Sequence, residues 1–253
     1  RVEAVGVDVT GFKPGDKVFG DFDGYGGFAE YACGPASALA LMPDNASFAE
    51  AAAMPIAGLT ALQSLRDRGR INAGQQVLIN GASGGVGSYA VQIAKAEGAI
   101  VTGVCSTRNV ELVRSLGADH VIDYTEEDFT TGAKNYDIIL EAVGNVPLAG
   151  INRALKPNGV AVIVGVTSLW RVLHIALFGA RIGKQQGKSI AMMLADIKQD
   201  DLNTLGELFA AGKIKSVIDK RYPFDATAEA IAYLETGRAR GKVIIDIAEA
   251  DTV

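Results

Sequence analysis

A glycine-rich turn between an apolar run and a helical run limits the possible folds of this chain more than any other feature. The apolar run covers residues 76–80, and the turn covers residues 81–87 with the letters GASGGVG. Apolar residues at helical spacing follow over residues 86–97. Glycines permit a tight reversal with no side chain in the way. The pattern therefore predicts a buried strand followed by a closely packed helix.

The alternation of buried strands and helices continues to about residue 166. Strands are expected over residues 76–80, 100–105, 120–123, 137–141 and 160–166, and helices over residues 86–97, 109–116 and 148–155. Gly98 and Gly117 stand where left-handed residues end helices. Because parallel strands need helical crossovers, we predict an α/β fold built on a doubly wound parallel sheet of the Rossmann type.

Shorter elements are expected on both sides of this central block. Upstream, the sequence predicts strands over residues 2–6, 17–19, 27–33 and 38–42, as in part of a barrel or sandwich, and helices over residues 48–54 and 58–67. Downstream, it predicts strands over residues 189–194, 216–222 and 242–247 and helices over residues 201–211 and 226–235.

The glycine turn has the composition of a phosphate-binding turn. The first amides of a helix have no partner within the helix and attract anions. A pyrophosphate can approach them only where no Cβ intervenes, so we expect a dinucleotide at this turn, the alternative being a strand-to-helix turn without a ligand. The residues expected at the phosphates are Gly81, Ser83, Gly84, Gly85, Val86 and Gly87.

The residues that follow the strand expected over residues 100–105 help to distinguish an NAD(H) site from an NADP(H) site. An NAD site usually has Asp or Glu there, which accepts from the ribose 2′-hydroxyl. This chain has Ser106, Thr107 and Arg108 after Cys105. Two hydroxyls and a guanidinium suit a 2′-phosphate, so we predict NADP(H). The alternative is a helix cap at Ser106 or Thr107 beside an ordinary surface arginine.

Charge and composition limit the function classes. A formal net charge of −5 and a pI near 5.2 argue against a general binder of nucleic acid or anionic membranes. The two cysteines and two histidines do not make a convincing zinc site. No signal peptide and no long apolar run is present, so we expect a cytoplasmic protein without a membrane span.

Several motifs stand in an order that resembles the medium-chain dehydrogenase/reductase superfamily, and more narrowly its zinc-independent quinone oxidoreductase branch. They are GFKPGDKVFG at 11–20, GGFAEY at 26–31, AAMPIAGLTA at 52–61, the glycine turn, LGAD at 116–119 and GKVI at 241–244. The resemblance implies a GroES-like catalytic domain from residues 1–54 and 206–253 and a Rossmann NADP-binding domain from residues 55–205. It also implies that part of the catalytic domain, with its catalytic residues, lies upstream of Arg1. Residues 54–57 lack the cysteine of zinc-dependent relatives.

The resemblance also suggests further cofactor-binding positions. Thr60 would face the nicotinamide, Tyr124 the adenosine end and Lys242 the substrate cleft. Two turns would complete the site, formed by Ala142, Val143 and Gly144 and by Gly165 and Val166. The alternatives are a helix hydroxyl bonded to its own backbone for Thr60, a half-buried aromatic for Tyr124 and a solvated lysine for Lys242.

Together these features predict hydride transfer from NADPH to a small-molecule substrate, a quinone or an activated alkene or carbonyl, without zinc and with the proton from water or an unassigned hydroxyl. The alternatives are a zinc-free alcohol or enoyl-thioester reductase on the same fold, and an NADPH-binding sensor or scaffold without turnover.

The resemblance further suggests a homodimer, joined through an edge strand at residues 189–194. Residues 169–184 form an apolar segment with a basic end. We expect a lid or dimer-contact helix there, the alternative being peripheral contact with a membrane.

Overall fold

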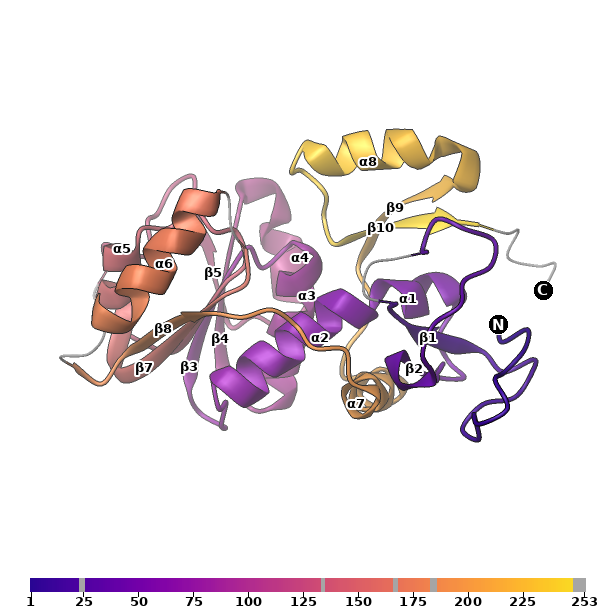
Figure 1. The fold of residues 1–253 in the computed structure, drawn as a ribbon. Coiled ribbons are helices and arrows are strands. Elements are labelled where there is room, and N and C mark those ends of the chain that lie inside the picture. Colours follow the sequence, from indigo (N-terminus) through magenta and orange to yellow (C-terminus); the bar gives the residue numbers. More distant parts are fainter. Residues whose placement is uncertain (23–25, 133–134, 166–167, 183–185, 248–253) are drawn as a thin grey trace. The chain divides into compact units, whose positions relative to one another are not determined.

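The computed structural model describes residues 1–22, 26–132, 135–165, 168–182 and 186–247, which form two compact units (Figure 1). One unit comprises residues 60–195, and the other joins residues 1–59 to residues 196–253. The identification of domains over residues 1–54, 55–205 and 206–253 stays a prediction.

The unit of residues 60–195 is built on a six-stranded parallel sheet. Its strands are β3 (Gln76–Asn80), β4 (Ile100–Cys105), β5 (His120–Asp123), β6 (Tyr136–Glu141), β7 (Leu155–Ile163) and β8 (Ser189–Met192). Their spatial order is β5-β4-β3-β6-β7-β8, with every neighbouring pair parallel. This order reverses beside the first strand, as in the Rossmann fold. The predicted α/β class and doubly wound sheet are confirmed.

Helices cover both faces of this sheet. Figure 1 shows α3 (Gly85–Ala96) and α4 (Val110–Ser115) on one face and α5 (Leu148–Ala154) and α6 (Leu169–Ile182) on the other. Ile139 and Ile163 of the sheet pack with Ile151 of α5 and Ile175 of α6 in one buried cluster. Burying each such side chain contributes about 1.5–3 kcal/mol, which explains the long apolar runs of the strands.

Two helix ends in this unit were predicted from single glycines. Gly98 follows α3 with φ of +77°, and Gly117 follows α4 with φ of +101°. In this left-handed region a Cβ is strained, so glycine ends the helix at low cost. Both predicted helix ends are confirmed.

One strand of the sheet differs from its prediction. β7 begins at Leu155 rather than near residue 160, because a register shift inserts residues between two paired stretches. Tyr136 pairs with Leu155, but Ile138 already pairs with Val160. A bulge of this kind breaks the apolar pattern and hides the start of the strand.

The second unit combines both ends of the chain. It contains an antiparallel pair, β1 (Val18–Gly20) with β2 (Leu39–Leu41), and a parallel pair, β9 (Ile218–Pro223) with β10 (Lys242–Asp246). Its helices are α1 (Phe48–Ala53), α7 (Gln199–Ala210) and α8 (Thr227–Glu235). Ala49 and Ala53 of α1 pack on Ile244 of β10, and the Ser216 hydroxyl donates to the Glu50 carbonyl oxygen at 2.7 Å.

The strands predicted over residues 2–6 and 27–33 are wrong. Both segments are irregular and largely exposed, with Val5, Phe28 and Tyr31 open to solvent. Val2 exchanges backbone hydrogen bonds with Gly15 and Asp16, but this contact does not extend into a ladder. An alternating pattern forms a strand only where a partner strand and a buried face are present.

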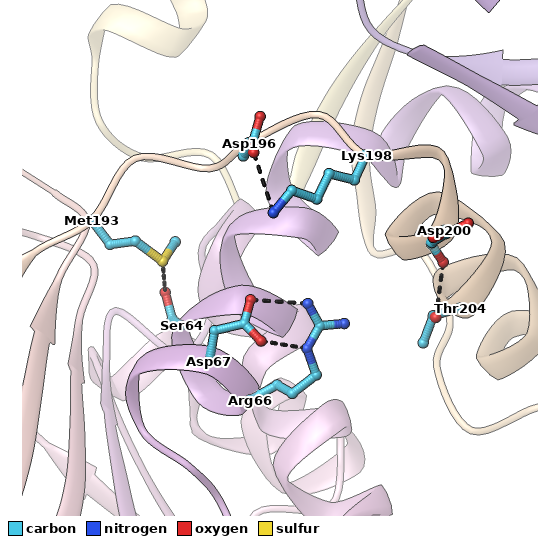
Figure 2. Close-up of polar contacts among 8 residues, drawn as sticks. All are labelled: Ser64, Arg66, Asp67, Met193, Asp196, Lys198, Asp200 and Thr204. Carbon is cyan, nitrogen blue, oxygen red and sulfur yellow. Dashed lines mark hydrogen bonds and ion pairs between the residues drawn. The ribbon is translucent and has the colours of Figure 1, made fainter. Parts of the chain in front are cut away.

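The helix α2 (Pro55–Gln63) continues into a π-helical turn, Ser64–Arg68. Figure 2 shows the buried Ser64 hydroxyl donating to the Met193 sulfur at 3.5 Å and the Arg66 guanidinium paired with Asp67 at 2.6 Å. The Ser64 bond ties the turn to the segment that follows β8, and the Arg66–Asp67 pair lies within the turn. The predicted helix over residues 58–67 is thus replaced by two helical segments of different pitch.

Within the described part of the chain, no helix has the length and apolar character needed to cross a membrane.

Candidate functional site

The turns that carry most of the predicted site residues meet at one edge of the sheet. They follow β3, β4, β5, β6 and β7, and parallel strands end at a common edge. The turns contain, in chain order, Gly81, Ser83, Gly84, Gly85, Val86, Gly87, Ser106, Thr107, Arg108, Tyr124, Ala142, Val143, Gly144 and Gly165. Val166 lies outside the described residues.

Two glycines of the first turn are required by packing, and one leaves open surface. Gly81 has φ of +84°, and a Cβ on it would lie 2.8 Å from Val143 Cγ2. A Cβ on Gly87 would collide with the Gly81 carbonyl oxygen. A Cβ on Gly84 would meet only that oxygen, at 3.3 Å. Gly81 and Gly87 thus hold the helix close to the sheet, and Gly84 leaves its outer side bare.

The start of α3 offers amides to an anion. Gly84 occupies the N-cap position of this twelve-residue helix, where a glycine has no side chain to cap it. The amides of Gly85, Val86 and Gly87 belong to its first turn, where a helix supplies no carbonyl partner. Their partial positive charge points toward the open side of the glycine turn.

In the turn after β4, the Ser106 hydroxyl does not cap the helical turn that follows it. Ser106 stands at the N-cap position of a short 3-10 turn, Thr107–Asn109, and its side chain makes no capping bond. The hydroxyl instead accepts from Asn109 Nδ2 at 3.3 Å. The predicted alternative of a cap at Ser106 is therefore absent, and Arg108 beside it is exposed.

A carboxylate that the sequence reasoning missed lies next to this turn. Asp123 ends β5 in register with Cys105, and Thr125 donates to it from its hydroxyl at 2.7 Å and its backbone at 3.0 Å. Thr107 binds the same cluster, with its hydroxyl 3.2 Å from that of Thr125. Hydrogen bonding by the Thr107 hydroxyl and then by the Thr125 N–H lowers the pKa of Asp123. The carboxylate is therefore charged at neutral pH.

A second missed residue, Glu141, joins three turns at the end of β6. Its side chain is fully buried, and Oε1 accepts from Asn80 Nδ2 and from the amides of Val143 and Gly144, each at 2.9 Å. Its carbonyl oxygen accepts from the amides of Val164 and Gly165 at 3.0 and 3.3 Å. One residue thus fixes the turns after β3, β6 and β7. In the sequence, the feature that could have drawn attention to Glu141 is a single acidic residue at the end of an apolar strand.

The remaining predicted residues have different surroundings. Tyr124 is 62% exposed, so the alternative that it is a half-buried aromatic does not describe the structure. Thr60 is buried in α2. Lys242 lies in the unit formed by the chain ends, where burial lowers its pKa against the opposing effect of Asp21. Lys242 is half-buried rather than freely solvated.

The two cysteines have different surroundings. Cys105 is buried, and burial followed by the Asp123 charge raises its pKa to about 11, so it is an unreactive thiol at neutral pH. Cys33 is exposed. Among the residues whose placement is described, no three His, Cys, Asp or Glu side chains gather in a group that could hold a metal ion.

Comparisons with known proteins agree with the fold. Residues 116–245 match the family model for zinc-binding dehydrogenases. A chloroplastic quinone oxidoreductase of Triphysaria versicolor is 37% identical over 97% of this chain and 77% of its own length. This chain belongs to the medium-chain dehydrogenase/reductase superfamily.

Within that superfamily, the chain falls in the quinone-oxidoreductase-like group. The solved quinone oxidoreductase of Coxiella burnetii superposes with a TM-score of 0.85 at 32% identity, covering 96% of this chain and 76% of that one. A trans-enoyl reductase of Aspergillus terreus is 36% identical over 98% of this chain and 75% of its own length. The superfamily assignment makes the protein an oxidoreductase that uses a nicotinamide cofactor. The expected cytoplasmic location stays a prediction, since one of these relatives is chloroplastic.

Proposed function

We propose that this medium-chain reductase uses NADPH to reduce a quinone or an activated alkene or carbonyl, without zinc. The observation that carries the proposal is the shared edge of the sheet, where the bare glycine turn, the uncapped start of α3 and the Ser106–Arg108 turn lie on neighbouring strands. The names of the quinone oxidoreductase relatives support the substrate class.

The glycine turn supports binding of the pyrophosphate. Phosphate oxygens need donors, and the amides of Gly85, Val86 and Gly87 have none of the helix carbonyls as partners. Gly84 leaves the space that a close approach requires. Glu141 holds the neighbouring turns in place, so the site is formed before the cofactor arrives.

The turn after β4 supports NADPH over NADH. No carboxylate follows Cys105 in the position that usually accepts from the ribose 2′-hydroxyl. Ser106 offers a hydroxyl that caps nothing, and Arg108 offers a guanidinium at an exposed position. A 2′-phosphate would gain charge-assisted hydrogen bonds from this pair, which a 2′-hydroxyl cannot match.

The residues of this chain orient the cofactor, and the bound nicotinamide supplies the hydride. Thr60, Tyr124 and Val143 are proposed as further contacts, and the role suggested for Lys242 stays a prediction. We propose that the reaction does not use zinc, because suitable ligands are missing. Residues 54–57 carry no cysteine, and Cys105 is buried with a raised pKa. A substrate proton is proposed to come from water or an unassigned hydroxyl.

The test is NADPH oxidation by the whole chain with a panel of small quinones, 2-alkenals and a simple alcohol. We expect turnover with a quinone or an alkenal, unchanged by a zinc chelator. Turnover on the alcohol alone, or activity that the chelator abolishes, would overturn the proposal.

A reductase of enoyl thioesters is the second candidate, favoured by the trans-enoyl reductase relative. It shares the cofactor site and differs in substrate. An enoyl thioester added to the same panel separates the two: preference for the thioester over every quinone, measured as kcat/KM, would select this candidate.

A further inference from the structure

One buried amide connects the two turns that are proposed to hold phosphate groups. Asn109 is 5% exposed, and its Nδ2 donates to Ser83 Oγ at 3.0 Å and to Ser106 Oγ at 3.3 Å. Ser83 belongs to the glycine turn after β3, and Ser106 begins the turn after β4. The backbone N–H of Asn109 also donates to the Ser106 carbonyl oxygen at 2.8 Å, which fixes the amide between the two hydroxyls.

The direction of these bonds decides where the hydroxyl protons point. A serine hydroxyl has one proton to donate and two lone pairs that accept. Asn109 uses a lone pair on each oxygen, so each proton remains to be donated. Among the described residues, neither Ser83 nor Ser106 has an acceptor for that proton. Ser83 is only 9% exposed, and a hydroxyl that donates to nothing is costly there.

The oxygen of the amide, unlike its nitrogen, has no hydrogen-bond partner among the described residues. This oxygen, Asn109 Oδ1, is buried. A buried polar atom without a partner costs about 1–3 kcal/mol. An apolar residue of similar shape would avoid this cost, so what the amide contributes is the pair of bonds that Nδ2 donates to Ser83 and Ser106.

We propose that Asn109 is a positioning residue that turns the Ser83 and Ser106 hydroxyls outward as donors to two phosphate groups of one NADPH molecule. Ser83 donates to the pyrophosphate, and Ser106 donates to the 2′-phosphate. Asn109 does not touch the cofactor. The inference rests on the proposed function, because it assigns both turns to the phosphates of NADPH.

The chemistry of the amide separates this role from simple packing. Aspartate at this position has nearly the same shape but accepts hydrogen bonds, so it would draw both protons inward and place a negative charge behind the phosphates. Leucine is also similar in shape and would leave the hydroxyls without orientation. Both substitutions spare Ser83 and Ser106 themselves.

The test compares NADPH and NADH binding by titration calorimetry in the whole chain. We expect Asn109→Asp and Asn109→Leu to raise the Kd for NADPH about tenfold or more, since charge-assisted hydrogen bonds are lost. The Kd for NADH rises less, because NADH has no 2′-phosphate for Ser106. A change that acts only on folding would weaken both nucleotides equally.

The same substitutions in a Ser83→Ala/Ser106→Ala background form the decisive control. Without the hydroxyls, Asn109→Leu should change the Kd for NADPH by less than about twofold, as expected when a residue acts only through removed partners. An undiminished effect in this background, or an unchanged Kd in the Asn109 single variants, would overturn the inference. If Asn109→Asp does not fold, Asn109→Leu carries the same comparison.

Failure of this inference differs from failure of the proposed function. Wild-type protein that binds neither nucleotide defeats the proposed function. Wild-type protein that binds NADPH as tightly as its Asn109→Leu variant defeats only the role of Asn109.

Discussion

Asp123 places a negative charge beside Thr107, next to the residues proposed to meet the 2′-phosphate. Like charges repel, so we expect Asp123→Asn to lower the Kd for NADPH several-fold and to leave the Kd for NADH nearly unchanged. Because the lowered pKa keeps Asp123 charged and a 2′-phosphate is almost fully ionised above pH 7, the effect should be nearly constant from pH 7 to 8, and added salt should weaken it.

Glu97→Gln provides the matched control. Glu97 is an exposed acid at the other end of α3, so the same change of charge there should not alter nucleotide preference. If Asp123→Asn and Glu97→Gln lowered the Kd for NADPH equally, the effect would come from the net charge of the protein and the prediction would be contradicted.

The sequence could predict those site residues whose role is local. The glycines at 81–87 are recognised because they stand between an apolar run and a helical run. The hydroxyls after Cys105 are recognised because they directly follow a strand. The roles of Asp123, Asn109 and Glu141 could not be predicted, because each side chain also bonds to a residue at the end of a different strand or in the turn after it. Only the strand order brings Asn80 beside Glu141 and Ser83 beside Asn109.

At the scale of elements, Glu141 connects the ends of β3, β6 and β7. We expect Glu141→Ala to lower the free energy of unfolding by about 3 kcal/mol, since it leaves several buried donors unpaired. Glu141→Gln retains an acceptor oxygen, so it should cost about 1 kcal/mol and leave NADPH binding largely intact. Denaturant unfolding of both variants tests this, and equal losses would contradict it.

A second prediction concerns the ion pair between α3 and the segment entering β5. Lys95 Nζ lies 2.8 Å from Asp119, which also accepts from the Val101 N–H at 2.7 Å. Burial alone would raise the pKa of Asp119, but bonds from Lys95 and Val101 outweigh it and lower the pKa. A lowered pKa stabilises the fold above the unfolded value of about 3.9, and this contribution is lost as pH falls through the folded value.

Asp119→Asn should therefore lower the free energy of unfolding at pH 7 by about 1 kcal/mol, a figure reduced for the partial exposure of the pair. The difference from wild type should shrink below pH 4. Unfolding curves measured from pH 3 to 7 test the sign, and a difference that grows toward acid pH would contradict it.

The sequence predicted elements best where burial is greatest. The bounds of β3 and β4 were predicted to the residue, because strands covered on both faces are continuous apolar runs. The bounds of the edge strand β5 were also correct, although its His120 is exposed. The strands expected over residues 2–6 and 27–33 failed, since alternation alone supplies no partner strand. The early start of β7 was hidden by its bulge.

At the scale of the whole molecule, the edge strand β8 of the six-stranded sheet is a candidate surface for contact with a second copy of the chain. Among the described strands, β8 pairs with β7 alone, and Ala191 is exposed on it. We propose a homodimer through this edge, so light scattering should give twice the chain mass, and Ala191→Lys should shift the protein toward monomer. Ala149→Lys, at an exposed position on α5, is the control. A wild-type monomer at all concentrations would contradict the proposal.

The most direct test of the central claim is calorimetric titration of the folded protein with NADPH and with NADH. The proposed site at the carboxyl edge predicts binding of NADPH with a Kd at least tenfold below that of NADH, and loss of that preference in Arg108→Ala. No heat with either nucleotide, or tighter binding of NADH, would contradict it.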